Sequence, residues 1–151
     1  MILNYFVTLF RSILCPSNFK NSFDGISVLC QDAEMTWNIE YTDEFAQWWD
    51  TLPAETQVSI AANVRLLEMH GPQLPFPHSS GIQGSRHSHM RELRVQHNGK
   101  PHRTLYAFDP QRTAILLIGG DKTGDDRWYK KMIPVADKLY DQHLKLLQKE
   151  H

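Results

Sequence analysis

The sequence predicts one α+β domain of order β-α-α-β-β-β-α, with a small, mostly antiparallel sheet, an N-terminal helical hairpin and a C-terminal helix. Apolar and polar residues alternate, as in half-buried strands, near residues 37–41, 92–96 and 102–108, and a continuous apolar run spans 113–118. Apolar residues at helical spacing separate the first strand from the other three. Short turns between the later strands favour antiparallel pairing.

The N-terminal 34 residues lack this patterning. The apolar stretch Met1–Phe10 is interrupted by polar residues and is shorter than the ~20 residues that a membrane span needs. It also lacks the preceding positive charge of a signal peptide. Neither Cys15 nor Cys30 has a partner at metal-ligand spacing, which favours a reducing compartment. We expect residues 1–34 to be an extension outside the fold and residues 35–151 to form a cytoplasmic domain without membrane contact.

Two helices are expected after the first strand. Thr42 can cap the first helix, and Asp43 follows where negative charge is favourable. Pro53 suits the start of the second helix, and Gly71 followed by proline ends it. The apolar stripe that we expect on the second helix comprises Val58, Ala61, Ala62, Leu66 and Met69.

The rest of the chain contains strands, turns and one more helix. Residues 72–89 are rich in Pro, Ser, Gly and His and predict a long loop. The Asn98–Gly99 pair predicts a hairpin turn, residues 109–112 a second turn and residues 119–124 a loop. Pro134 is the expected start of the last helix, with an apolar face formed by Val135, Leu139, Leu144 and Leu147.

Several kinds of site are not supported by the sequence. The loop from Gly119 to Gly124 does not match the spacing of a phosphate-binding loop. There is no nucleophile elbow and no acidic cluster for a two-metal nuclease. The eight histidines are expected to lie mostly on the surface; the pair His87 and His89 could supply only two metal ligands. We therefore expect neither a metal nor a cofactor.

Positive charge is concentrated in one segment. The net charge of the chain is −1, but residues 86–131 hold ten lysines and arginines and five acids, a local balance of +5. Such a segment can form a site for a polyanion, although a solvated charged surface would have the same composition.

A cationic and aromatic set lies within this segment. Arg94 and Arg103 flank the Asn-Gly turn, so their side chains can reach one face of the sheet, and we expect Arg103 to be exposed there. Lys122 follows the third strand of the group, and Trp128, Tyr129, Lys130 and Lys131 come next. Such residues can cleave RNA without a metal, because cations stabilise the transition state and an aromatic ring stacks on a base. Surface cations beside core aromatics remain the alternative.

The later part of the chain contains five motifs in this order: Met90–Val95, Arg103–Asp109, Leu116–Lys122, the pair Trp128–Tyr129, and Ile133–Asp137. This ordered series resembles the phage-derived HigB-like branch of the RelE/ParE toxin superfamily. The resemblance covers about residues 36–150. It implies the toxin of a type II toxin–antitoxin system: a ribosome-dependent mRNA endonuclease, neutralised by a helix-turn-helix antitoxin and associated with DNA only through that complex.

The same resemblance assigns roles to particular residues. It implies that Arg103, Lys122, Arg94 and Tyr129 are catalytic, and we place Arg91, Trp128, Lys130 and Lys131 in the RNA-binding surface. Two positions depart from the RelE pattern, which has a second lysine where this chain has Glu92 and an arginine where it has Lys122. The general base therefore stays unassigned. A ParE-like inhibitor of DNA gyrase without nuclease activity remains the alternative within the superfamily.

The domain boundary can be tested by truncation. A chain that begins at Met35 is expected to fold, bind its antitoxin and inhibit growth like the full chain, because residues 1–34 have no pattern of a packed element. Circular dichroism, antitoxin pull-down and growth after induction measure the three properties. Loss of folding on truncation would place the boundary earlier in the chain.

Overall fold

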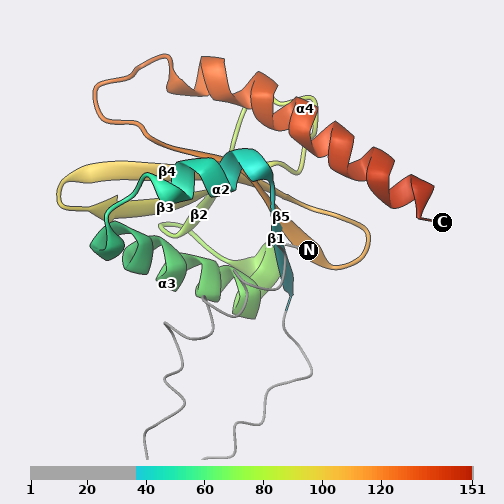
Figure 1. The fold of residues 1–151 in the computed structure, drawn as a ribbon, viewed down its shortest axis with the longest axis horizontal. Helices are drawn as coiled ribbons and strands as arrows, with labels where there is room; N and C mark the ends of the chain where they lie inside the picture. The colour runs from blue at the N-terminus through green and yellow to red at the C-terminus, as the bar shows by residue number, and fades with distance from the viewer. Residues whose placement is uncertain (1–36, 151) are drawn as a thin grey trace, which may run out of the picture. The chain divides into compact units, whose positions relative to one another are not determined.

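The computed structural model describes residues 37–150, which form a sheet with helices on both faces (Figure 1). In chain order the elements are β1 (Asn38–Tyr41), α2 (Asp43–Asp50), α3 (Ala54–His70), the 3-10 helix η1 (Gly71–Gln73), β2 (Ser79–Gly81), β3 (Arg91–His97), β4 (Lys100–Phe108), β5 (Thr113–Asp121) and α4 (Trp128–Lys149). The prediction about residues 1–34 lies outside the described residues. No helix within 37–150 is long and apolar enough to cross a bilayer.

The sheet has five strands in the order β1-β5-β4-β3-β2. Only β1 and β5 pair in parallel; the other three pairings are antiparallel, so the predicted α+β class and mostly antiparallel sheet are confirmed. The strand β2 was missed, because three residues of Ser-Ser-Gly carry no alternation that distinguishes a short edge strand from a loop.

The hairpin between β3 and β4 fixes the register that the site depends on. Asn98 and Gly99 both have positive φ, 49° and 74°, as a two-residue turn that matches the twist of the strands requires. The turn places Arg94 directly opposite Arg103. The predicted turn and the pairing of the two strands are both confirmed.

The sheet separates two apolar layers. Leu105 and Ala107 of β4 and Leu117 of β5 pack against Ala136 and Tyr140 of α4. Gly119 and Gly120, neighbours in β5, show that α2 and α4 cover opposite faces of the sheet. A Cβ added to Gly119 would overlap the Trp48 ring of α2, and one added to Gly120 would come within 2.5 Å of Trp128 Nε1 of α4.

Two predictions about the helices were wrong in detail. In α3 the buried positions are Thr56, Ile60, Ala61, Val64 and Leu67, whereas Val58 and Met69 are 48% and 52% exposed. Apolar residues lie on both sides of this helix, so spacing alone could not select the face that meets the sheet. The helix α4 begins at Trp128 rather than at Pro134, which lies inside the helix in its second turn, where a proline removes one backbone hydrogen bond without ending the helix. Its buried face includes Ile133 and Leu139, but Val135 is 38% exposed.

The close packing at the two glycines predicts matched effects on stability. Gly119→Ala and Gly120→Ala are expected to lower the free energy of unfolding by roughly 1–3 kcal/mol, because the new methyl group overpacks a buried ring. Gly81→Ala is the control, since nothing lies within 4 Å of its added Cβ. Urea denaturation measures all three. Equal stability of Gly119→Ala and Gly81→Ala would contradict the packing of Trp48 on β5.

Candidate functional site

The cationic side chains predicted from the sequence meet on the face of the sheet that α4 covers. Arg94 and Arg103 are opposite one another on β3 and β4, and residues opposite one another project to the same face. Glu92 lies two residues before Arg94 and therefore shares that face. This group, together with Lys122 and Tyr129, is called the cationic cluster below.

Glu92 lies at the centre of the cationic cluster and is only 3% exposed. Its Oε1 accepts hydrogen bonds from Arg94 Nη1 at 2.9 Å and from Ser80 Oγ at 2.8 Å. Its Oε2 accepts one from the Tyr129 hydroxyl at 2.6 Å and lies 3.9 Å from Arg103 Nε. The carboxylate thus joins β2, β3, β4 and α4, and its charge is compensated despite burial.

Lys122 enters the cluster from the segment between β5 and α4. Its backbone N–H donates to the Pro101 carbonyl at 2.9 Å, which ties this segment to β4. Its Nζ lies 4.8 Å from the centroid of the Tyr129 ring, close enough for a cation–π interaction. The four residues expected to be catalytic are therefore brought together, while their roles stay predictions.

The environment of Arg103 differs from the expectation. Arg103 is 8% exposed, whereas we expected an exposed side chain. The helix α4 begins six residues before Pro134, and its first turn helps to cover this end of the sheet. Arg103 Nη1 donates to the His102 carbonyl at 3.0 Å, and the buried Nε of Arg103 has no hydrogen-bond partner within residues 37–150. Removal of Arg103 should therefore affect stability as well as chemistry.

An open groove of about 460 Å³ lies beside the cluster. Arg94 and Arg103 line one side of it, and residues of α3, β3 and the loop before β2 complete it: Ser59, Asn63, Pro77, His78, Val95 and Gln96. Three cations and one carboxylate leave the cluster with an excess of positive charge. The groove can therefore accept an anionic group.

Burial and the neighbouring carboxylate keep the Tyr129 hydroxyl protonated. Partial burial raises the pKa of Tyr129, the hydrogen bond and charge of Glu92 raise it further, and Arg103 opposes them. The phenol is thus a hydrogen-bond donor at neutral pH rather than a base.

The proposed RNA-binding residues do not form one surface with this cluster. Arg91 lies on the opposite face of β3, because it is three residues from Arg94, and its Nε donates to Ser79 Oγ at 3.1 Å. Trp128, expected in the RNA-binding surface, is 4% exposed and packs in the core, so its ring does not lie on that surface. Lys130 is exposed, and Lys131 pairs with Asp125 at 3.0 Å on the surface.

Glu92 is the site residue that sequence reasoning missed. It was treated as a departure from a lysine pattern, although its alternation with Arg94 and the hairpin register together indicated that it would face Arg103. The charge pattern alone could not reveal that three donors would converge on this carboxylate.

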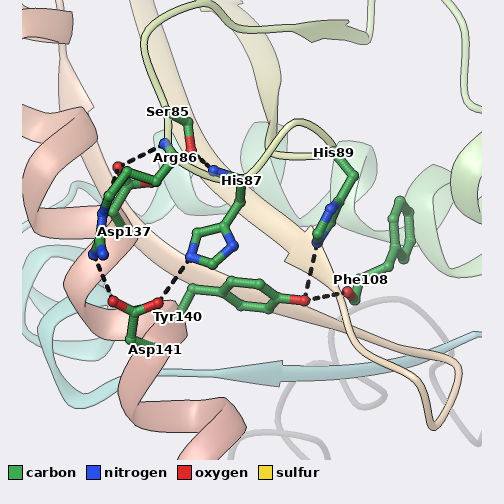
Figure 2. A network of polar contacts seen from close by, with 8 residues as sticks. All are labelled: Ser85, Arg86, His87, His89, Phe108, Asp137, Tyr140 and Asp141. Carbon is green, nitrogen blue, oxygen red and sulfur yellow. Dashed lines mark hydrogen bonds and ion pairs between the residues drawn. The ribbon is translucent and has the colours of Figure 1, made fainter.

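A second polar network holds the loop before β3 against α4 (Figure 2). Asp137, 4% exposed, accepts hydrogen bonds from Ser85 Oγ and the Arg86 backbone. His87 Nε2 lies 2.8 Å from Asp141, which also pairs with Arg86. This network fixes α4, the helix that supplies Tyr129, relative to the sheet.

The histidines are less exposed than expected. His102 is 5% exposed on β4, and burial lowers the pKa of its imidazole. His143 pairs with Asp109 at 2.9 Å. A histidine becomes buried when it lies on the inner face of a strand, as His102 does, or partly buried when it pairs with a carboxylate, as His143 does. The composition of the chain indicates neither position. In residues 37–150 no group of three or more His, Cys, Asp or Glu is arranged to hold a metal ion.

The sequence comparisons place the chain in a family. The model of the family described as "Phage derived protein Gp49-like" matches residues 47–141, well over half of the chain, and the protein belongs to this family. It is similar to two proteins of Mycobacterium tuberculosis. It is 37% identical to "Putative toxin HigB2" over 79% of this chain and 59% of that protein. It is 43% identical to "Putative toxin HigB3" over 65% of this chain and 85% of that protein.

Solved structures of RelE proteins are also similar to this chain. The free Escherichia coli toxin RelE, as a mutant, has a TM-score of 0.46 and 8% identity over 62% of this chain and 92% of that chain. RelE in the RelE–RelB complex of Pyrococcus horikoshii has a TM-score of 0.44 and 12% identity over 60% and 99%. The family assignment rests on the sequence matches.

The coupling of Glu92 to Tyr129 can be tested by titration. Glu92→Gln is expected to lower the pKa of Tyr129 toward, but not to, its ordinary value of 10.0, because the charge of Glu92 is lost while burial remains. Since folding raises this pKa, the phenol stabilises the fold below pH 10, and that stability is lost as pH rises through the folded pKa. As pH rises through this range, the free energy of unfolding of Glu92→Gln should therefore fall by less than that of the wild type.

NMR of tyrosine labelled with ¹³C at Cζ measures these pKa values. Tyr41 is the internal control, since burial first and then Asp43 and Asp50 raise its pKa, and Glu92 is not among the causes. An unchanged Tyr129 titration in Glu92→Gln would contradict the hydrogen bond.

Proposed function

We propose that this protein is the toxin of a type II toxin–antitoxin pair and acts as a ribosome-dependent mRNA endonuclease that inhibits translation. The two named toxin relatives support the biological class. The observation that supports the chemistry is the convergence of Arg94, Arg103, Lys122 and Tyr129 around one buried carboxylate beside an open groove.

The proposed reaction needs no metal. The 2′-hydroxyl of a nucleotide attacks the adjacent phosphorus, a 2′-O–P bond forms, and the P–O5′ bond breaks to give a cyclic phosphate and a 5′-hydroxyl. The 2′ proton passes to a base, and the leaving 5′ oxygen gains a proton. Arg94, Arg103 and Lys122 stabilise the charge that develops on the phosphoryl oxygens. Tyr129 is protonated and engaged by Glu92, so it is not the base in this scheme.

The proposed partners follow from the same function. The ribosome and mRNA are the targets in the cytoplasm. A helix-turn-helix antitoxin is the inhibitor, and the complex contacts DNA only through that antitoxin. An acidic surface of the antitoxin can cover the excess positive charge of the cationic cluster, an interaction that salt screens at the rim.

Variants of Arg103 test the proposal. Arg103→Ala is expected to reduce mRNA cleavage by roughly a hundred- to a thousandfold, because it removes a donor to the transition state. Arg103→Lys should also be impaired, since an ammonium group cannot replace the planar guanidinium. Because Arg103 is buried, Arg103→Ala should also lose about 1–3 kcal/mol of stability. Induction in bacteria, mapping of mRNA 5′ ends and thermal melting measure these effects.

Arg65→Ala is the matched control, because Arg65 is exposed on α3 and, among residues 37–150, pairs only with Glu68 of the same helix. Arg65→Ala should arrest growth like the wild type, and coexpression of the antitoxin should relieve the arrest caused by either protein. Wild-type cleavage by folded Arg103→Lys and Arg103→Ala would remove Arg103 from the active site. Growth arrest without mRNA cleavage, together with inhibited supercoiling by gyrase, would replace the nuclease with the ParE-like alternative.

A further inference from the structure

An exposed aromatic ring lies beside the cationic cluster. Phe76, in the loop between η1 and β2, is 69% exposed, the largest exposure among the bulky apolar side chains described as exposed in residues 37–150. A single exposed apolar residue is ordinary in a soluble protein. Its position therefore matters more than its exposure.

Arg94 connects Phe76 to the cluster. The guanidinium of Arg94 lies 5.2 Å from the centroid of the Phe76 ring, while its Nη1 is bonded to Glu92. One side chain thus contacts both the buried carboxylate and the exposed ring. The guanidinium lies over the ring, and 69% of the residue is exposed, so a large part of the ring is accessible from solvent.

The loop that carries Phe76 also lines the groove beside the cluster. Pro77 and His78, the next two residues of the same loop, line the groove together with Arg94 and Arg103. An aromatic platform at the edge of a positively charged groove is the usual means of holding unpaired bases beside their phosphates. A purely apolar partner would gain little here, because the neighbouring lining residues Ser59, Asn63 and His78 are polar.

We propose that Phe76 is a base-stacking platform for single-stranded RNA, and that it holds a base next to the phosphate bound by Arg94 and Arg103. This inference rests on the proposed nuclease function. Phenylalanine has no hydrogen-bonding group, so the platform accepts any base and contributes affinity rather than sequence preference. Arg94 behind the ring fixes its orientation and strengthens the stack.

Three substitutions at Phe76 separate the effect of ring stacking from the effect of side-chain size. In a reconstituted translation mixture, Phe76→Ala and Phe76→Leu are expected to raise KM for cleavage of a reporter mRNA by about five- to a hundredfold with little change in kcat, because the aromatic face is lost. Phe76→Trp should cleave at least as well as the wild type. Met69→Ala, which removes another exposed apolar side chain from α3, should change nothing. Melting temperatures should stay within a few degrees, because the site is exposed.

A direct contact can be detected by crosslinking. Full-chain protein is irradiated with ribosomes that carry an mRNA containing 5-bromouracil and 2′-O-methyl groups, which block the attacking hydroxyl. The crosslinked peptide identified by mass spectrometry should contain Phe76. A crosslink pattern without that peptide would overturn the platform.

The other outcomes distinguish the platform from the nuclease itself. Wild-type cleavage by Phe76→Ala and Phe76→Leu, with cleavage lost in Arg103→Lys, would overturn the platform alone. Full activity of Phe76→Leu with failure of Phe76→Ala would show that only bulk matters. Weaker antitoxin binding without a change in cleavage would assign Phe76 to a protein interface. Absence of cleavage by the wild-type chain would overturn the nuclease and the platform together.

Discussion

The buried carboxylate of Glu92 is the interaction on which the rest of the site depends. Arg94 and Arg103 lie directly opposite one another on adjacent strands, an arrangement that is unfavourable for like charges. Glu92 lies within ion-pair distance of both and offsets this repulsion. Burial of the carboxylate is costly in turn, but Ser80, Arg94 and Tyr129 supply hydrogen bonds to it. Each charge in the cluster is tolerated because the others are present.

The same carboxylate makes the site depend on the docking of α4. Tyr129 reaches Glu92 from the first turn of this helix, while the sheet supplies both arginines. Two other features fix the helix: Trp128 packs over Gly120 near its start, and the network around Asp137 and Asp141 holds it further along (Figure 2). Small shifts of α4 would therefore change the cluster, although the network joins the helix to the loop before β3 eight or more residues beyond Tyr129.

The sequence predicted those parts of the structure that local rules determine. Alternation and the Asn-Gly turn defined β3, β4 and their pairing, which was enough to bring Arg94 and Arg103 together. The burial of Arg103 was not predictable, because it depends on the start of α4, which Pro134 obscured. The role of Glu92 was missed for a similar reason, since its partners come from four separate elements. Local patterns determine which residues share a face, whereas tertiary packing determines which of them are buried.

The balance of charge explains how a partly buried cluster can act on an anion. One carboxylate cannot neutralise Arg94, Arg103 and Lys122, and the buried Nε of Arg103 has no hydrogen-bond partner in the part of the chain that the structure describes. Under the proposed function, a phosphate in the adjacent groove supplies the missing negative charge. Donors already held by Glu92 need little reorganisation when charge grows on the phosphoryl oxygens, so their contribution is larger in the transition state than in the bound substrate. Under the same proposal, Glu92 favours catalysis by fixing the cations of the site.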